Sequence, residues 1–233
     1  MEKKLKAIIL LGAPGSGKGT QANLLAEKLD LYHLDNGKML RKKYSNFKPE
    51  EFIESEGEKY YFEDEKKKYD TGELSNPFFI LGLIKETIKQ VMESDQGLVL
   101  SGSPRTLPET KKLMPFLTTL YGKENIKIFF LSLDVKDSIW RNSRRRICEL
   151  MEHSILYSEE TKNLSLCPFD GSKLIKRKLD TPETIEKRFE VFEQETFPIV
   201  KYIEEQGFEV NQINGKQTVA NVHYDILKSI IPS

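Results

Sequence analysis

Short apolar runs recur along the chain, and amphipathic stretches separate them. Runs of strand length lie at Ala7 to Leu11, Gly97 to Leu100, Ile126 to Leu133 and Phe208 to Ile213, with Leu31 to Leu34 as a shorter fifth candidate. The first is apolar throughout and the third is mostly apolar, which is typical of parallel strands covered on both faces. Strands that alternate with helices predict an α/β fold with a five-stranded parallel sheet and right-handed crossovers.

The stretches between these runs have the apolar spacing of helices. The predicted helices cover Lys18 to Leu29, Asn36 to Lys43, Asn76 to Glu93, Pro108 to Tyr121, Lys136 to Leu150, Thr181 to Gln206 and Lys216 to Ile230. Two segments break the alternation. Lys42 to Asp70 is dense in charged and aromatic residues and predicts a small helical lobe without a strand. Met151 to Lys178 contains turn residues such as Pro168 and predicts a short β-rich excursion.

Composition narrows the class of protein. With 233 residues, 38% of them hydrophobic, the chain can bury the core of one large domain with small inserted lobes. Basic and acidic residues each number 36, so no net charge attracts nucleic acid or a membrane. Cys148 and Cys167 are too few for a secreted disulfide framework, and no apolar stretch is long enough for a signal peptide or a membrane span. We expect a cytoplasmic monomer.

A glycine-rich segment, Gly12 to Thr20, separates the first apolar run from the first predicted helix. Gly12, Gly17 and Lys18 fit the spacing G-x-x-x-x-G-K. Backbone N–H groups in such a loop and at the helix start bind phosphate, and the lysine adds a mobile cation. The next position, Gly19, lacks the hydroxyl that usually ligates magnesium. The strand, loop and helix context favours a phosphate-binding loop over a glycine-rich turn without a ligand.

This loop resembles that of adenylate kinase and, more broadly, of the nucleoside monophosphate kinases. Met39-Leu40-Arg41 is similar to the family's segment whose arginine grips the monophosphate, and Gly102-Ser103-Pro104-Arg105-Thr106 is similar to its G-F-P-R-T motif. The arginines at 141 and 145 and the pair Arg177 and Arg188 fall where the family has phosphate-clamping arginines. The resemblance covers essentially the whole chain, which looks like a divergent member.

The resemblance implies a fold and a reaction. It implies a P-loop three-layer fold with a core of residues 1–34, 76–146 and 181–233. The inserted helical monophosphate-binding lobe covers residues 35–75, and a small β-rich lid covers residues 147–180. The implied reaction is phosphoryl transfer from ATP to a nucleoside monophosphate, with AMP as the first choice. An unrelated P-loop ATPase or small-molecule kinase would leave the arginines unexplained.

Each implied role falls on matched positions. ATP would contact Gly15, Ser16, Gly17, Lys18, Gly19, Thr20, Arg141, Arg145 and Gln217. The monophosphate would contact Asn36, Arg41, Glu73, Leu74, Ser75, Gly102, Arg105, Glu109, Arg177 and Arg188. The catalytic set would be Lys18, Arg105, Arg145, Arg177 and Arg188. Arginine suits this chemistry because its planar fork bonds phosphate oxygens bidentately and keeps its charge in a closed site. For Arg144 and Arg146 we prefer surface salt bridges.

The sequence departs from the family at the positions that hold the water shell of magnesium. Ser101 and Lys38 replace two aspartates that hold the metal's water shell in the family, and Gly19 offers no hydroxyl. One hypothesis is that Lys38 supplies part of the lost cationic charge, which gives a slower or less magnesium-dependent kinase. The other is a nucleotide-binding pseudoenzyme of the same fold.

The acceptor base and the lid are two further departures. Glu109 replaces the glutamine that reads adenine in the family. An ionised carboxylate only accepts hydrogen bonds, so it suits guanine and makes GMP the alternative acceptor. In the lid, Cys148, Cys167 and Asp170 match relatives with a bound zinc, but Met151 does not, and His153 is out of register as a fourth ligand. Zinc and a lid held by hydrogen bonds and apolar contacts both remain open.

Overall fold

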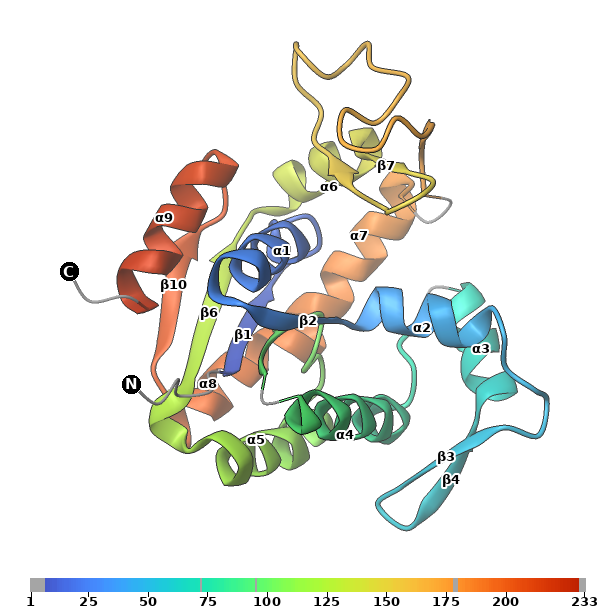
Figure 1. Cartoon of the computed structure of the whole chain (residues 1–233), viewed down its shortest axis with the longest axis vertical. Coiled ribbons are helices and arrows are strands. Elements are labelled where there is room, and N and C mark those ends of the chain that lie inside the picture. Colours follow the sequence, from blue (N-terminus) through green and yellow to red (C-terminus); the bar gives the residue numbers. More distant parts are fainter. Residues whose placement is uncertain (1–6, 72, 95, 178–179, 231–233) are drawn as a thin grey trace.

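A five-stranded parallel sheet forms the centre of the computed structural model, which describes residues 7–71, 73–94, 96–177 and 180–230. Its strand order is β10-β6-β1-β5-β2 (Figure 1). The strands are β1 (Ala7–Gly12), β2 (Leu31–Asp35), β5 (Gly97–Ser101), β6 (Ile126–Ser132) and β10 (Val210–Asn214). The five predicted strands are therefore confirmed, although the last begins two residues later than predicted.

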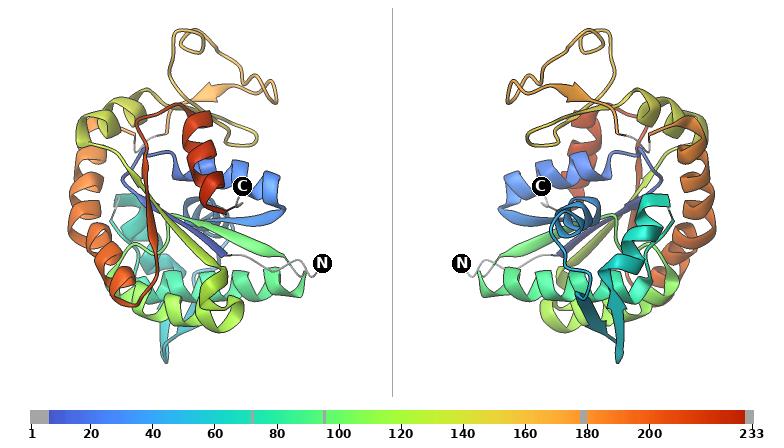
Figure 2. Two further views of the ribbon diagram at one scale, coloured as in Figure 1. Left: turned by 90° about the vertical axis from the view of Figure 1, so that its left-hand side faces the viewer. Right: turned by 90° about the vertical axis from the view of Figure 1, so that its right-hand side faces the viewer.

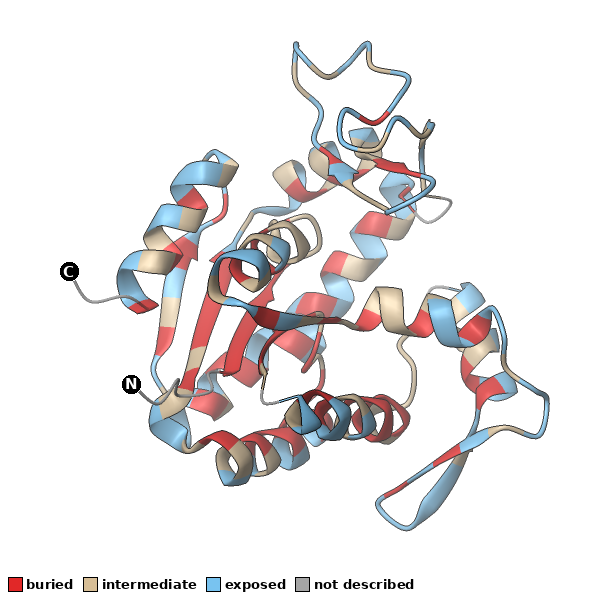
Figure 3. Ribbon diagram, viewed as in Figure 1, coloured by how far each residue is buried: buried red, intermediate tan, exposed pale blue. Residues whose placement is uncertain are grey.

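Helices cover both faces of the sheet (Figure 2). Ile8 and Leu10 pack on the face covered by α1 (Lys18–Leu29) and α9 (Val219–Ile230). The alternate residues of the same strand pack on the other face, which is covered by α4 (Pro77–Glu93), α5 (Leu107–Tyr121) and α8 (Phe197–Glu205). Successive strand side chains point to opposite faces, so one continuous apolar run fills two cores. The predicted three-layer α/β fold is confirmed, and the buried strands are evident in Figure 3.

Three predicted helices differ from the structure by more than one residue, and the last of them begins at Val219 instead of Lys216. The helix predicted over Lys136 to Leu150 is too long: α6 (Val135–Arg144) ends where Arg145 takes an extended backbone and the chain enters strand β7 (Arg146–Cys148). The helix predicted over Thr181 to Gln206 consists of α7 (Pro182–Val191), the π-helical turn η2 (Phe192–Thr196) and α8. The remaining short element of the core is the 3-10 turn η1 (Lys123–Asn125). Over the described residues, no helix combines the length and apolar character needed to cross a membrane.

The prediction that Lys42 to Asp70 lacks a strand is wrong. Between α2 (Asn36–Tyr44) and α3 (Phe62–Thr71), the chain forms an antiparallel hairpin of β3 (Phe52–Ser55) and β4 (Glu58–Tyr61). Glu56 and Gly57 both have positive φ at its turn, as a tight two-residue hairpin turn requires. Ile53 is buried against Gly82 of α4, where a Cβ would clash with its side chain. High charge concealed this short alternation of exposed and buried residues.

A small lid lies beyond the carboxyl ends of the central strands (Figure 1). It contains β7 (Arg146–Cys148), β8 (Ser154–Ile155) and β9 (Leu174–Ile175), which pair antiparallel in the order β8-β7-β9. The lid therefore contains strands as predicted, but they have only two or three residues each. Cys148, Ile155 and Cys167 form its small buried cluster, and backbone hydrogen bonds such as that from the Cys167 N–H to the Ser172 carbonyl close its turns.

Candidate active site

The glycine-rich loop connects β1 to α1 and leaves its backbone N–H groups at the helix start. Gly17 is the N-cap of α1 with a φ of 99°, a left-handed conformation that glycine adopts without strain. Gly15 also has positive φ, and a Cβ there would clash with the Asn142 amide. From α6, the Ser138 hydroxyl donates to the Pro14 carbonyl over 2.7 Å. The sheet and α6 therefore fix a loop whose helical N–H groups are available to an anion.

Lys18 is folded under this loop. Its Nζ donates to the carbonyl oxygens of Gly12 and Ala13, each over 2.7 Å. Burial, together with the nearby cations Arg105, Arg188 and Arg145, lowers the pKa of this amine to about 7. An anion at the loop would reverse this effect, because negative charge favours the protonated amine.

Six of the nine donor-side residues predicted from sequence line one pocket: Gly15, Ser16, Gly17, Thr20, Arg141 and Gln217. The other three, Lys18, Gly19 and Arg145, are not among its lining residues. Arg141 donates to the Gly215 carbonyl over 2.9 Å, and Gln217 donates to Asp225 over 2.9 Å, so both side chains are anchored.

Sequence reasoning missed the aromatic wall of this pocket. Trp140 of α6 and Tyr157 of the lid line it. Their rings pack edge to face, with centroids 5.9 Å apart. Trp140 is the only tryptophan of the chain and precedes the predicted Arg141 directly. Tyr157 lies in the lid, far away in sequence, and no local pattern indicated it.

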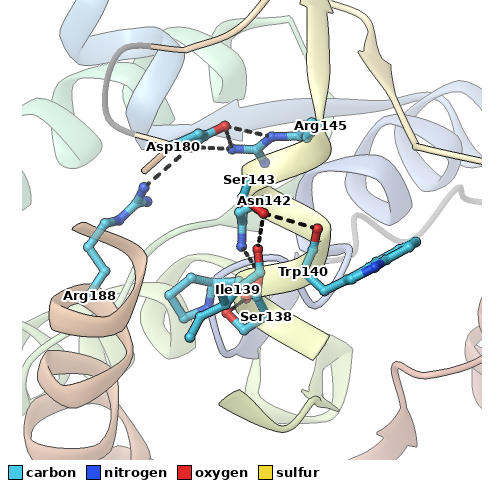
Figure 4. A network of polar contacts seen from close by, with 9 residues as sticks. Ser138, Ile139, Trp140, Asn142, Ser143, Arg145, Asp180 and Arg188 are labelled. Carbon is cyan, nitrogen blue, oxygen red and sulfur yellow. Dashed lines mark hydrogen bonds and ion pairs between the residues drawn. The ribbon is translucent and has the colours of Figure 1, made fainter. Parts of the chain in front are cut away.

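Arg145 and Arg188 converge on Asp180, a buried carboxylate that the sequence analysis did not single out (Figure 4). Arg145 binds Asp180 through Nε and Nη2, with distances of 2.7 to 3.1 Å. Arg188 Nη1 lies 4.0 Å from the same carboxylate. Burial and the neighbouring Arg105 lower the pKa of Arg188 to about 10, despite the opposing effect of Asp180. The cations therefore outnumber their carboxylate partner.

Arg177 belongs to the same cluster. Its Nε is buried without a hydrogen-bond partner. Burial, followed by repulsion from Arg145 and Arg41, lowers its pKa. A buried donor without a partner is costly, so this guanidinium is suited to an anionic ligand.

The preferred interpretation of Arg144 and Arg146 as surface salt bridges is wrong. Arg144 lies over the rings of Trp140 and Tyr157, at 5.2 and 6.0 Å from their centroids. Arg146 donates to the backbone carbonyls of Leu164 and Thr161 in the lid. Both side chains contact the lid and form no ion pair within the described residues.

On the acceptor side, Glu109 is buried beneath the Gly102 to Thr106 turn. Its carboxylate accepts hydrogen bonds from the Ser103 hydroxyl and, over 2.9 Å, from the Arg105 backbone N–H. Burial raises its pKa, although these hydrogen bonds and Arg105 oppose the change. The Asn36 amide donates to the Gly102 carbonyl and to Ser103, while Asn36 Oδ1 is buried without a partner.

Arg41 of α2 contacts the lid. Its Nε donates to Glu152 Oε1 over 2.9 Å and its Nη2 to Oε2 over 2.5 Å. Arg105 Nε donates to the Gly102 carbonyl over 2.7 Å. The Thr196 hydroxyl of η2 donates to the Arg105 carbonyl over 2.9 Å. Glu73, Leu74 and Ser75 lie in the connection between α3 and α4, on the acceptor-side lobe.

Ser101, one of the positions that replace the family's magnesium-shell aspartates, takes part in a polar network. The Ser101 Oγ lies 2.7 Å from His33 Nε2, and His33 Nδ1 lies 2.6 Å from Asn23 Oδ1. Burial lowers the pKa of His33 to about 4, so the ring is neutral. Because Asn23 Oδ1 can only accept, His33 Nδ1 carries the hydrogen and Nε2 accepts a hydrogen bond from the Ser101 hydroxyl. Asp35 is the acidic group beside the loop: a Cβ at Gly19 would lie 4.0 Å from Asp35 Oδ2. Its other oxygen caps α2 through the Lys38 N–H.

The lid brings four ligand-type side chains together. Donor atoms of Cys148, His153, Cys167 and Asp170 all lie within 4.8 Å of one another. The expectation that His153 is out of register is wrong, because a turn closed by the Glu152 N–H and the Cys148 carbonyl folds it back. Met151, by contrast, is 57% exposed.

A phosphate-binding loop after β1, a parallel sheet and a cluster of arginines beside the loop define a P-loop nucleotide-binding protein. The adenylate kinase family profile matches residues 10–208. The chain is 30% identical to the adenylate kinase of Clostridium botulinum over 220 residues, which cover 94% of this chain and 95% of that protein. It is 32% identical to the adenylate kinase of Methanothrix thermoacetophila over 223 residues, which cover 95% and 96%. The chain belongs to the adenylate kinase family, and its predicted class, a phosphotransferase, is confirmed.

Proposed function

We propose that this protein transfers the terminal phosphoryl group of ATP to AMP and forms two ADP. The observation that carries the proposal is the concentration of positive charge around Lys18, whose pKa three arginines help to lower. Such a cluster is unfavourable alone and favourable around phosphates. The names of the relatives agree with this reaction.

In the proposed mechanism, the loop N–H groups, Lys18, Arg141 and Arg145 bind the donor phosphates. Arg41 and Arg105 bind the acceptor phosphate, and Arg177 and Arg188 contact both. An oxygen of the acceptor phosphate attacks the terminal phosphorus of ATP, a new P–O bond forms, and the bond to the ADP leaving group breaks. The protein contributes alignment and stabilisation of charge on the transferred group, because this reaction needs little covalent chemistry.

The lid excludes water from this transfer. Leu156 and Tyr157 of the lid line the donor pocket, and Arg146 of β7 binds lid carbonyls. Water near the terminal phosphate would compete with AMP as the nucleophile. The lid contacts thus favour transfer to AMP over hydrolysis of ATP.

AMP is the proposed acceptor even though Glu109 replaces the family's glutamine. Both Glu109 oxygens already accept hydrogen bonds, which weakens the argument that this carboxylate selects guanine. Asn36 Oδ1 has no partner, and it suits an amine such as the exocyclic group of adenine. GMP is the alternative to be tested.

Magnesium fits the residues that the chain retains. Asp35 and Thr20 offer the hard oxygen atoms that this ion prefers, and we propose that Asp35 holds its water shell in place of the two missing aspartates. Bound to ATP, the ion would neutralise phosphate charge. Asp35→Asn should raise the magnesium concentration required for ATP binding, measured by calorimetry, whereas Lys38→Asp with Ser101→Asp should lower it. Equal requirements in all variants would contradict this assignment.

The first experiment is ADP formation from ATP with AMP, GMP, CMP or UMP, with and without magnesium. We expect turnover with AMP above the others. A strong preference for GMP would indicate that Glu109 recognises the acceptor base. ATP binding without turnover of any acceptor would identify a nucleotide-binding pseudoenzyme.

We also propose that the lid binds zinc through Cys148, His153, Cys167 and Asp170. Both sulfur atoms lie 3.5 Å from His153 Nδ1. A tetrahedral zinc with bonds of about 2.3 Å to sulfur and about 2.0 Å to nitrogen requires roughly this separation. His153→Ala should remove the zinc found by elemental analysis and lower the melting temperature, whereas Met151→Ala should retain it. Equal zinc content in the two variants would contradict the ligand set.

The proposed enzyme acts as a monomer in the cytoplasm. Every residue of the proposed site comes from one chain. The net formal charge is zero, so we propose neither nucleic acid nor a membrane as a partner. Light scattering of the purified protein tests the monomer.

A further inference from the structure

The carboxylate of the lid residue Glu152 binds the two Arg41 nitrogens that a phosphate would bind. The two carboxylate oxygens face Nε and Nη2 at 2.9 and 2.5 Å. This two-point geometry is the one in which a guanidinium binds a phosphate. The contact joins residues 111 positions apart, one on α2 and one on the lid. An acceptor phosphate therefore meets an arginine that already has an anionic partner.

Charge distribution explains why a carboxylate is found there. Arg145 and Arg41 lie close enough to repel Arg177, and Asp180 and Glu152 are the carboxylates that offset this repulsion at Arg177. Asp180 has a side-chain exposure of 2% and is fixed to Arg145, whereas Glu152 has an exposure of 29%. Glu152 is therefore the carboxylate that an incoming anion can displace.

The lid turn presents Glu152 to Arg41. Glu152 has a φ of 55°, a left-handed conformation that is unfavourable for residues with a side chain. Its N–H donates to the Cys148 carbonyl over 3.1 Å and closes the turn. The side chain then extends from the turn toward α2, so the contact is part of the folded lid.

We propose that Glu152 competes with the acceptor phosphate for Arg41 and so sets the affinity for the acceptor. This inference rests on the proposed role of Arg41 in binding AMP. Binding of AMP replaces the carboxylate with a phosphate and at the same time breaks one contact between the lid and α2. Glu152 thus lowers acceptor affinity without contacting the donor.

Glu152→Gln tests the competition, because it keeps the size of the side chain and removes its charge. A partly exposed ion pair of this geometry corresponds to roughly a three- to tenfold change in affinity. We expect the KM for AMP to fall by that factor while the KM for ATP stays constant. Glu149→Gln, an exposed acid on the same lid turn, is the matched control and should change neither value.

A double-mutant cycle separates competition from a structural role of Glu152. In an Arg41→Met background, Glu152→Gln should no longer change AMP affinity. An unchanged or increased KM for AMP in Glu152→Gln alone would overturn the inference. AMP binding is also measured by calorimetry, which does not depend on turnover. Tighter AMP binding in Glu152→Gln without ADP formation would support the competition and contradict the proposed function.

Discussion

The donor and acceptor sides of the site differ in what holds their binding groups. On the donor side, backbone N–H groups of a glycine loop are fixed between β1 and α1, and Ser138 supports them from α6. On the acceptor side, long side chains carry the charge, and the protein supplies partners for them: Glu152 for Arg41 and the Gly102 carbonyl for Arg105. A site built from backbone is available without a ligand, whereas a site built from arginines forms contacts that a ligand must replace.

The same difference applies to electrostatics. On the donor side, Lys18 relies on neutral carbonyl oxygens, and its pKa falls to about 7. Where the two sides meet, Asp180 neutralises part of the charge of Arg145 and Arg188. The donor side is thus the more sensitive to loss of a cation, and the arginine cluster is the more sensitive to loss of a carboxylate.

Lys18→Met should have the largest effect. Removing the only lysine of the loop takes away charge that stabilises the transferred phosphoryl group, and we expect kcat to fall by about 10²- to 10³-fold or more. Steady-state ADP formation measures it. Lys28→Met at the other end of α1 is the control. A loss below tenfold would mean that the arginines alone carry the donor phosphates.

Asp180→Asn tests the arginine cluster. Removal of a buried carboxylate leaves Arg145 and Arg188 facing each other, which should lower the free energy of unfolding by about 2–3 kcal/mol, with allowance for the partial exposure of Arg145. Urea unfolding measures it. Asp137→Asn, which removes the ion pair between the half-buried Asp137 and the exposed Lys216, should cost less than about 1 kcal/mol. Equal losses in the two variants would contradict a special role for Asp180.

Glu109→Gln separates structure from base recognition on the acceptor side. An amide has one oxygen for the two hydrogen bonds that the carboxylate accepts, so we expect a loss of about 1–2 kcal/mol in stability. The ratio of AMP to GMP turnover should remain nearly constant. A large change in that ratio with unchanged stability would show that Glu109 contacts the base.

Protonation of Lys18 should couple ATP binding to pH. The free amine has a pKa of about 7, and bound phosphates raise it, so the complex takes up a proton above pH 7. ATP affinity should therefore fall about fivefold between pH 7 and pH 8 and vary little from this cause below pH 6. Calorimetry in buffers of different ionisation enthalpy counts the proton. Absence of proton uptake at pH 8 would contradict the lowered pKa.

Local patterns predicted the central sheet and the phosphate loop well. Apolar runs identified the strands, and four residues of the predicted loop line one pocket with Gln217. The hairpin at Phe52–Tyr61 was missed because its support, Gly82 of α4, lies in a later helix. The end of α6 was misplaced because Arg145 leaves the helix toward Asp180, 35 residues further along the chain.

Sequence by itself determined the family, the three-layer fold and the cations that surround the phosphates, because these depend on hydrophobic period and on residues at fixed local spacing. Only the tertiary structure decided which partners those cations have. Asp180 and Glu152 reach the arginines, and His153 reaches the two lid cysteines, through the folding of the lid. These contacts depend on distances in space that no spacing along the chain encodes. Arginine charge is a property of the residue, whereas its availability to a ligand is a property of the fold.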